Sequence, residues 1–283
     1  KVGIIGYPLG HSLSPIFQQA AFDSLNIDIL YEAWPLQPKE IPSFIEDMKF
    51  QSILGINVTI PYKEIILDYL DDIDSEALSI GAVNTIVNSA GTLIGYNTDI
   101  VGFSKALSGF SGLNANNNKP VLILGAGGVA RSALRTLIIN GFKDITIANR
   151  TESRAKELAD EFLSDNDITI GTICTDHDKL PDISRSAYLI VNCTSVGMAG
   201  DLQGSSLLRS SDISQDSFVY DMVYNPTPTP LMDNAREAGA KVLNGLSMLI
   251  HQGAASFKLW TGIEPEFDIM LKAAEEALIM NHN

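Results

Sequence analysis

Cysteine is scarce in this chain, which has only Cys174 and Cys193 among its 283 residues. Neither has a neighbour at metal-ligand spacing, and two cysteines in a chain of this length do not form a disulfide framework. The four histidines are scattered, so the sequence offers no clustered ligands for zinc. We therefore expect no metal site and a reducing, cytoplasmic environment.

Basic residues are also few. The chain has 19 Lys and Arg against 34 Asp and Glu, a formal net charge of −15. This balance argues against nucleic acid or an anionic membrane surface as a partner. No signal peptide is recognised and no apolar run approaches 18 residues, so we expect a soluble protein. Any anionic ligand must be held by a local cluster of cations and N–H groups.

The length suits two domains better than one. From Val2–Ile5 onward, apolar strand-like runs alternate with helical patterns, which predicts a mostly parallel α/β layer. The acidic stretch Asp71–Ser79 reads as a solvated helical face. A polar loop at Asn114–Asn118 precedes the next buried run, which places the end of the first domain between about residues 98 and 118.

A glycine motif opens the second half of the chain. The run Val121–Leu124 is typical of a buried strand, and a helical pattern covers Val129–Asn140. Between and just after them, Gly125, Gly127 and Ala130 fit G-x-G-x-x-A, in which the glycines allow a tight turn and close approach of a pyrophosphate. The alternative is an ordinary strand-turn-helix. A second strand at the expected distance favours a Rossmann-like dinucleotide site.

The residues after that second strand indicate which dinucleotide binds. An NAD site usually has an acid at this strand end, whereas this chain has Asn149-Arg150-Thr151. With Thr151 as N-cap, Arg154 lies in the first helical turn, where a cation opposes the helix dipole. A bound 2′-phosphate would explain that misfit, although both arginines could simply be solvated. The pattern favours NADP(H).

Two serines near the chain start allow two interpretations. Pro15 suits the first position of a helix, so Ser14 suits its N-cap. Capping needs only one serine, whereas Ser12 and Ser14 beside free helix N–H groups would form a small carboxylate-binding site. This segment alone does not decide between them.

A nicotinamide cofactor implies hydride transfer, so a group must move a proton at the substrate oxygen. Zinc ligands are not clustered, and no tyrosine has Lys four residues later, which excludes the Tyr-x-x-x-Lys pair of short-chain reductases. A lysine held by a carboxylate remains, and Lys63 with Asp99 is the candidate. Taken alone, Lys63 fits a solvated lysine at a helix start better than it fits a catalyst.

Eight motifs in sequence order resemble those of the shikimate dehydrogenase family. They span nearly the whole chain, which makes the resemblance far more specific than any single motif. They are His11-Ser-Leu-Ser-Pro15, Asn57-Val-Thr-Ile-Pro-Tyr-Lys63, Gly81-Ala-Val-Asn84-Thr, Asn97-Thr-Asp99, Gly125-Ala-Gly-Gly-Val-Ala-Arg131, Asn149-Arg-Thr151 with Arg154, Asn192-Cys-Thr-Ser-Val-Gly-Met198 and Gly245-Leu-Ser-Met-Leu-Ile-His-Gln252.

The resemblance implies reversible, NADPH-dependent reduction of 3-dehydroshikimate to shikimate, in aromatic amino-acid biosynthesis. It implies that Lys63 and Asp99 flank the reacting oxygen of the substrate, and it favours binding of the substrate carboxylate by Ser12 and Ser14. The implied substrate-binding residues are Ser12, Ser14, Thr59, Lys63, Asn84, Asp99, Tyr224 and Gln252. The implied cofactor-binding residues are Gly125, Ala126, Gly127, Gly128, Val129, Asn149, Arg150, Thr151, Arg154, Met222 and Gly245.

The resemblance also implies a substrate domain at residues 1–100, completed by returning C-terminal helices at 246–283, and an NADP-binding domain at 101–245. The expected state is a monomer or homodimer. Three alternatives stay open: a quinate/shikimate dehydrogenase of broader specificity, a non-catalytic NADP or shikimate sensor, and a folate-dehydrogenase-like enzyme. The last does not account for the Ser12 and Ser14 pair.

Overall fold

The computed structural model describes residues 1–10, 12–113, 119–162, 167–200, 202 and 204–280. The motif residue His11 and the predicted polar loop at 114–118 lie outside these described residues. The chain divides into two compact units. Unit 1 comprises Lys1–Gly102 and Leu249–Asn283, and unit 2 comprises Phe103–Met248.

Unit 1 is built on a mixed sheet with strand order β2-β1-β3-β5-β6-β4. The β1–β2, β1–β3 and β4–β6 pairs are parallel, and β5 runs antiparallel to β3 and β6. The strands are β1 Val2–Gly6, β2 Tyr31–Pro35, β3 Gly55–Val58, β4 Asp72–Ile73, β5 Thr85–Ser89 and β6 Thr92–Tyr96. The helices are α1 Ser14–Ser24, α2 Ile41–Met48, α3 Ser75–Ile80, α9 Leu246–Thr261 and α10 Phe267–Met280, with short 3-10 turns at Pro38–Glu40 and Ile65–Tyr69.

Alternation along β3 separates the two faces of this sheet, as the period of a strand requires. Ile56 and Val58 pack into the cluster that contains α2. Gly55 faces α9 instead, and a Cβ there would lie 2.2 Å from the indole nitrogen of Trp260. That indole donates to the carbonyl of Ile86 at 3.1 Å. The missing side chain of Gly55 therefore lets α9 lie directly on the sheet.

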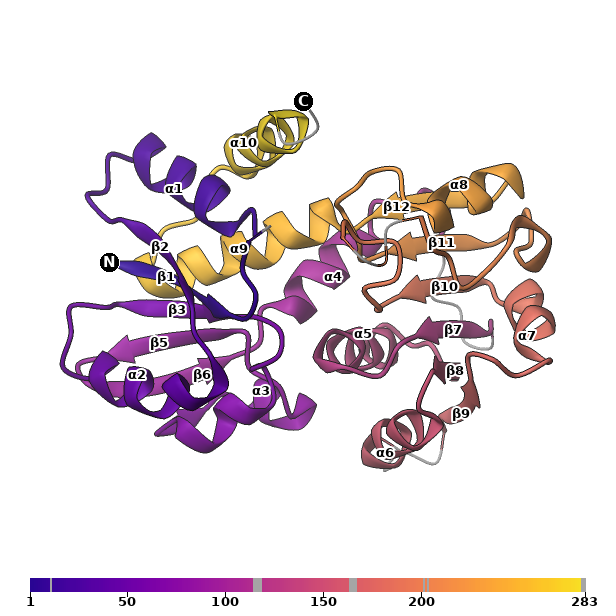
Figure 1. The fold of residues 1–283 in the computed structure, drawn as a ribbon, viewed down its shortest axis with the longest axis horizontal. Coiled ribbons are helices and arrows are strands. Elements are labelled where there is room, and N and C mark those ends of the chain that lie inside the picture. Colours follow the sequence, from indigo (N-terminus) through magenta and orange to yellow (C-terminus); the bar gives the residue numbers. More distant parts are fainter. Residues whose placement is uncertain (11, 114–118, 163–166, 201, 203, 281–283) are drawn as a thin grey trace. The chain divides into compact units, whose positions relative to one another are not determined.

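The C-terminal helices complete unit 1. Helix α10 packs beside α1, from the other end of the chain, and the two lie side by side in Figure 1. Helix α9 contacts α1 as well, because Gln18 donates its amide to the carbonyl of Gly253 at 2.9 Å. A Cβ on Gly253 would lie 2.4 Å from the Phe17 ring, so this crossing needs a glycine. The predicted return of these helices to the first domain is confirmed.

Unit 2 is a parallel sheet with strand order β12-β11-β10-β7-β8-β9, the order of a Rossmann fold. Its strands are β7 Val121–Leu124, β8 Asp144–Asn149, β9 Thr169–Cys174, β10 Leu189–Asn192, β11 Phe218–Asp221 and β12 Lys241–Asn244. Its helices are α5 Gly128–Ile139, α6 Glu152–Phe162, α7 Leu180–Ser186 and α8 Pro230–Glu237, with a 3-10 turn at Ser210–Asp212. Helix α4, Asp99–Leu107, begins in unit 1 and continues into unit 2.

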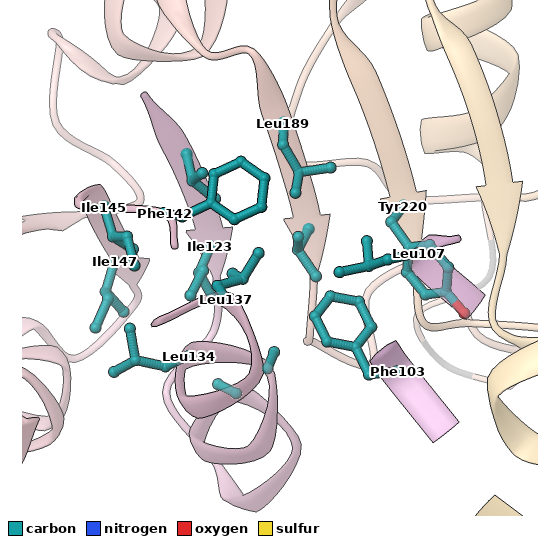
Figure 2. Packing of buried hydrophobic residues seen from close by; sticks show 14 of the residues in the cluster. Phe103, Leu107, Ile123, Leu134, Leu137, Phe142, Ile145, Ile147, Leu189 and Tyr220 are labelled. Carbon is teal, nitrogen blue, oxygen red and sulfur yellow. The ribbon is translucent and has the colours of Figure 1, made fainter. Parts of the chain in front are cut away.

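Both faces of the second sheet are buried. Val121 and Ile123 of β7 face α4, α5 and α6, and Leu122 and Leu124 face α7 and α8. Figure 2 shows the first of these clusters, in which Phe103 and Leu107 of α4 lie close to Tyr220 of β11. The predicted fold class, an α/β substrate domain and a Rossmann-like domain, is confirmed by the two sheets.

Some local predictions were wrong. Ser14 is the first residue of α1 rather than its cap, and Leu13 occupies the cap position without a side-chain bond. Within the acidic stretch 71–79, Asp72–Ile73 forms a short strand before helix α3. Strand β9 and helix α7 were not predicted at all. In the described part of the chain, no helix has both the length and the apolarity needed to cross a membrane.

Candidate active site

Four connections of unit 1 open at one edge of its sheet. Because β1 and β3 are parallel, the segments that follow them, with Ser12 and Lys63, leave at the same edge. Strand β5 is antiparallel to β3, so Asn84, just before it, lies at this edge too. Strand β6 returns antiparallel to β5 and delivers Asp99 there. The topology therefore gathers most of the predicted substrate-site residues of this unit.

Lys63 and Asp99 form an ion pair at this edge. The lysine Nζ lies 2.6 Å from Asp99 Oδ2, and the two side chains are only 12% and 5% exposed. No α-helix begins at Lys63, and its own carbonyl accepts the backbone N–H of Val83 at 2.8 Å. Lys63 is thus a largely buried, paired lysine rather than a solvated one at a helix start.

Asn84 holds the other oxygen of the aspartate. Its Nδ2 donates to Asp99 Oδ1 at 2.8 Å, while its Oδ1 accepts the backbone N–H of Thr98 at 2.7 Å. From α9, the side-chain oxygen of Gln252 lies 3.3 Å from the same Asn84 nitrogen. Asn97 accepts the N–H of Asp99 at 3.0 Å, at the start of α4. The carboxylate is therefore held on both oxygens.

The serine pair lies at the start of α1. Ser12 precedes the helix and its Oγ accepts the N–H of Ser14 at 3.3 Å, so Ser12 satisfies one free N–H group of this helix end. Ser14 is buried. Thr59, after β3, is half-buried and donates its N–H to Ile5 of β1 at 3.0 Å. These three hydroxyls come from connections at the same sheet edge as Lys63.

In unit 2 the glycine turn has the shape of a phosphate cradle. Gly125 follows β7 with φ +106° and donates its N–H to Ala148 at 2.7 Å. Gly127 caps α5 without any side-chain bond, and a Cβ placed on it would meet no atom within 4 Å. Gly128 and Val129 form the first turn of α5, whose N–H groups point away from the helix. The cradle of Gly125, Ala126 and Gly127 can therefore accept an anion at the positive helix end.

The end of β8 carries the predicted 2′-phosphate residues. Asn149 donates its amide to the carbonyl of Thr151 at 2.8 Å, which shapes the turn into α6. Helix α6 begins at Glu152, so Arg154 does lie in its first turn. Arg150 and Arg154 are exposed, and neither forms an ion pair within the part of the chain that the structure describes. Both guanidinium groups are available to an anionic ligand.

The remaining predicted residues lie at the carboxyl end of β11 and after β12. A Cβ on Gly245 would lie 2.0 Å from the carbonyl oxygen of Met222, so the two segments touch through their backbones. Burial raises the pKa of Tyr224 to about 12, which keeps its hydroxyl protonated at neutral pH. Tyr224, Met222 and Gly245 belong to unit 2, and their roles stay predictions.

A buried carboxylate holds the loop that carries Met222 and Tyr224. Asp221 ends β11 and accepts hydrogen bonds from Asn192 at 2.8 Å, from the N–H of Val223 at 3.0 Å and from Thr229 at 2.5 Å. Burial raises the pKa of Asp221, while these hydrogen bonds oppose the rise. Asp221 is not recognisable from the sequence, because an acid at the end of a strand forms no distinctive pattern.

Sequence reasoning also missed a set of buried polar residues behind the ion pair. They connect β2, β3, β5 and α9 by side-chain hydrogen bonds, and they are Tyr31, Asn57, Thr85, Thr98 and Ser256. Asn57, Thr85 and Thr98 lie inside the motifs quoted above, which is the one signal that could have found them. Among the described residues, no cluster of His, Cys, Asp and Glu could hold a metal ion.

Family models match three parts of this chain. A model described as the shikimate dehydrogenase substrate binding domain matches residues 4–86. One described as shikimate / quinate 5-dehydrogenase matches residues 106–196, and one described as the shikimate 5′-dehydrogenase C-terminal domain matches residues 245–275. The resemblance inferred from the motifs is therefore confirmed.

Relatives match over nearly the full length. A shikimate dehydrogenase (NADP(+)) of Halothermothrix orenii is 40% identical over 278 residues, 98% of this chain and 95% of the relative. The crystal structure of shikimate 5-dehydrogenase from Thermus thermophilus in complex with NADP(H) and shikimate has a TM-score of 0.86 and 36% identity, covering 98% of this chain and 99% of that one. Quinate dehydrogenase from Corynebacterium glutamicum in complex with NAD has a TM-score of 0.86 at 28% identity, covering 97% of this chain and 98% of that one. On these grounds the chain belongs to the shikimate dehydrogenase family.

Proposed function

We propose that this protein catalyses the reversible, NADP(H)-dependent reduction of 3-dehydroshikimate to shikimate. The observation that carries the proposal is the buried ion pair of Lys63 and Asp99, at the sheet edge where the serine pair also lies. Its Halothermothrix relative is a shikimate dehydrogenase (NADP(+)), and its Thermus relative was crystallised with shikimate and NADP(H). An ion pair alone occurs in many proteins, so the family and the geometry support the function together.

The cofactor fits the residues of unit 2. The open space at Gly127 accepts a pyrophosphate that a Cβ would exclude, and the start of α5 supplies N–H groups for it. Arg150 and Arg154 would hold the 2′-phosphate that distinguishes NADP from NAD. Asn149 and Thr151 shape the turn that presents them. When bound, the nicotinamide supplies or accepts the hydride.

Lys63 moves the proton in this mechanism. As the substrate carbonyl is reduced, its oxygen gains negative charge and takes a proton from the lysine ammonium. Asp99, 2.6 Å from the lysine, keeps the Nζ in place before and after the transfer. Asn84 holds the second carboxylate oxygen, so Asp99 cannot rotate away from Lys63 without losing a hydrogen bond. In the oxidation direction the same groups act in reverse.

The substrate would lie along the sheet edge. Ser12 and Ser14 would bind its carboxylate at one end, and Thr59, Asn84 and Gln252 would bind its ring hydroxyls. This arrangement requires an anionic end and several hydroxyls on the ligand, which shikimate has. We further propose that the protein acts in the cytoplasm as a monomer or homodimer, without nucleic acid or membrane partners.

The decisive experiment follows reduced nicotinamide by its absorbance at about 340 nm. Shikimate and quinate are each offered with NADP⁺ and with NAD⁺. Fast reduction with shikimate and NADP⁺ alone is expected. Comparable rates with quinate or NAD⁺ would favour the broader quinate/shikimate alternative. This chain also resembles the Corynebacterium quinate dehydrogenase in structure. No turnover in any combination, with shikimate binding intact by calorimetry, would favour the sensor.

A further inference from the structure

Three strands of unit 2 end together where the order of its sheet reverses. From β7, strands β8 and β9 follow on one side of the sheet, and β10, β11 and β12 follow on the other. A dinucleotide lies across such a switch point, with one half on each side. The last residues of β7, β10 and β11, which are Leu124, Asn192 and Asp221, are in register there. Asn192 therefore lies between the glycine cradle after β7 and the loop that carries Met222 after β11.

The side chain of Asn192 is buried, with the residue only 2% exposed, and both of its polar atoms are hydrogen-bonded. Its Oδ1 accepts the N–H of Thr194 at 3.1 Å and the Thr194 hydroxyl at 2.7 Å. Its Nδ2 donates to Asp221 Oδ1 at 2.8 Å and to the carbonyl of Val196 at 3.4 Å. Because a backbone N–H can only donate and a carboxylate can only accept, the amide has one orientation.

The hydrogen bonds of this group use each hydrogen once. The Thr194 hydroxyl donates to Asn192, and its oxygen accepts the N–H of Val196 at 3.1 Å. The Thr229 hydroxyl donates to Asp221 Oδ2 at 2.5 Å, and the carboxylate only accepts. We call Thr194, Asn192 and Asp221 the strand-end bridge, because their side chains connect the ends of neighbouring strands.

One end of the strand-end bridge lies against the glycine cradle. A Cβ placed on Gly125 would lie 3.1 Å from Thr194 Cγ2 and 3.2 Å from the carbonyl of Cys193. Gly125 is also held from the side of β8, because its N–H donates to the carbonyl of Ala148 at 2.7 Å. The cradle therefore has an anchor that does not involve the Asn192 side chain.

The other end of the strand-end bridge holds the loop after β11. Val223 and Thr229, which also donate to Asp221, belong to that loop. Asn192 instead comes from the neighbouring strand β10. It also accepts the backbone N–H of Met222 on its own carbonyl at 3.0 Å. Without the Asn192 side chain, the bonds from Val223 and Thr229 would join Asp221 to its own loop and not to β10.

We infer that Asn192 is a positioning residue that sets where the nicotinamide half of the cofactor lies relative to its phosphates. The inference rests on the proposed function, because it concerns the NADP(H) site of that function. The cradle after β7 would hold the pyrophosphate, and the loop with Met222, on the other side of the switch point, would lie against the nicotinamide half. Hydride transfer needs the reacting carbons close and aligned, so a small shift of this loop lowers the rate strongly.

The first test compares Asn192→Leu with Ser217→Ala. Leucine has nearly the shape of asparagine but no hydrogen-bonding group. Ser217 is the matched control, because its buried hydroxyl donates to the carbonyl of Ala187 at 2.7 Å where the chain enters the same two strands, at the opposite edge of the sheet. Each variant loses a buried hydrogen bond, so both should unfold at a lower temperature than the wild type.

The two variants should differ in kinetics. We expect Asn192→Leu to lower kcat for shikimate oxidation about ten- to a hundredfold, with KM for NADP⁺ within about threefold of the wild type. Ser217→Ala should keep both constants. Equal losses of kcat in the two variants, or a loss confined to KM, would overturn the inference.

Single-turnover kinetics separate misplacement of the nicotinamide from loss of folded protein. With folded enzyme and NADP⁺ saturating and shikimate limiting, the first-order rate constant of NADPH formation does not depend on how much protein is unfolded. We expect this rate constant to fall about ten- to a hundredfold in Asn192→Leu and to match the wild type in Ser217→Ala. Slowing by deuterium at the carbon that gives up the hydride identifies the step. An unchanged rate constant in Asn192→Leu would overturn the inference.

A binding readout needs no turnover. NADPH fluoresces from its nicotinamide, whereas 2′-phospho-ADP-ribose carries the phosphates of the cofactor but no nicotinamide. We expect 2′-phospho-ADP-ribose to bind Asn192→Leu within about threefold of its affinity for the wild type, by calorimetry, because the cradle keeps its own anchor. The emission of bound NADPH should move toward that of free NADPH in Asn192→Leu and not in Ser217→Ala. A comparable loss of affinity for 2′-phospho-ADP-ribose would overturn the inference, because Asn192 would then support the cradle.

These readouts distinguish the inference from the proposed function. If the wild type has no dehydrogenase activity yet its bound NADPH and that of the variants show the expected emission, the proposed function fails and the inference stands. If the wild type is active but emission and rate constants are unchanged in Asn192→Leu, the inference fails and the function stands. Should Asn192→Leu not fold, Thr194→Val decides by the same readouts. It removes the hydroxyl that donates to Asn192 and keeps a branched side chain beside Gly125.

Discussion

At the scale of single residues, Lys63 is the group on which the proposed chemistry depends. Replacing Lys63 by alanine removes the proton donor but leaves the serines and ring-hydroxyl partners in place. We expect kcat to fall by about 10²–10⁴, the usual contribution of general acid–base catalysis, with a much smaller change in KM. Steady-state kinetics with shikimate and NADP⁺ measure both constants.

The matched control for that variant is Lys258→Ala. Lys258 lies on the exposed side of α9, the helix that carries Gln252, and pairs with Glu264 at the surface. Exposed pairs of this kind contribute little, so kinetics and stability should match those of the wild type. A Lys63→Ala enzyme with normal kcat and a raised KM would make Lys63 a binding residue only.

Gly127 and Gly125 differ in why they must be glycine. A Cβ on Gly127 meets no protein atom, and its φ of −102° suits any residue. The free energy of unfolding of Gly127→Ala should therefore lie within about 0.5 kcal/mol of that of the wild type. Its KM for NADP⁺ should rise at least about tenfold, because the methyl group occupies the space of the pyrophosphate. Calorimetric titration with NADP⁺ and urea unfolding separate the two effects.

Gly125→Ala is the comparison for this prediction. Gly125 has φ +106° and a Cβ there would lie 3.1 Å from the Thr194 side chain, so alanine is strained in the protein itself. We expect it to lower stability by about 1–3 kcal/mol. If Gly127→Ala were destabilised as much as Gly125→Ala, or bound NADP⁺ normally, the cradle would have another purpose than ligand binding.

At the scale of elements, Asp221 holds the segment that follows β11. Asp221→Ala leaves the donors of Asn192, Val223 and Thr229 without their acceptor, at about 1–3 kcal/mol for each unsatisfied group. Asp221→Asn keeps an oxygen for two of them, and its amide can donate to the Thr229 hydroxyl. We expect a loss of at least about 3 kcal/mol for alanine and below about 1.5 kcal/mol for asparagine, measured by urea unfolding.

The stability of Asp221→Asn relative to the wild type should depend on pH. Because burial raises the folded-state pKa of Asp221 above 3.8, the folded protein binds this proton more tightly than the unfolded chain does. The stability that Asp221 contributes through this proton is therefore largest at acid pH, and it is lost as pH rises from 3.8 through the folded-state pKa. As pH rises over this range, the urea unfolding midpoint of Asp221→Asn should increase relative to that of the wild type. A constant difference would mean that Asp221 has an ordinary pKa.

The elements show where sequence patterns succeed. Strand β7 is a continuous apolar run, and β10 has three apolar residues before Asn192; both are buried on both faces, so their composition predicts them. Strand β9 is an edge strand with Thr169, Gly171 and Thr172 among its residues, and its half-exposed pattern hides it. Strand β4 forms by pairing with Ile94 and Gly95 of β6, and Asp71 just before it accepts the N–H of Leu93. These contacts join residues 22 apart, which a local pattern does not reveal.

The site was predictable to the extent that it lies in local motifs. Lys63, Asn84 and Asp99 each follow or precede a strand, and the sheet topology brings them to one edge. Short segments cannot reveal which atoms face each other once the chain folds. Asn57 meets Ser256 across 199 residues, and Thr85 meets Ser256 across 171. Only the tertiary structure shows that these residues form one hydrogen-bonded group.

At the scale of the whole molecule, unit 1 is discontinuous in sequence and unit 2 is continuous. A chain ending at Met248 lacks α10 and nearly all of α9, and so loses Phe257, which packs on Phe22 at 4.5 Å between ring centroids. It also loses the indole of Trp260 on β5 and the hydroxyl of Ser256. Unit 2 keeps every strand and helix of its own core in that chain.

We therefore expect the 1–248 chain to retain a folded unit 2 and to lose the stable fold of unit 1. Hydrogen exchange followed by mass spectrometry should show protection of β7 and β10 close to that in the full chain. Strands β1 and β3 should exchange rapidly, because apolar residues of unit 1 that α9 and α10 cover would then face water. Residues 103–248 expressed alone serve as the control and should unfold cooperatively. Protected β1 and β3 in the shortened chain would mean that residues 1–102 fold by themselves. In that case the proposed domain of 1–100 with 246–283 would be two separable pieces, and Gln252 would be an addition to a site already formed.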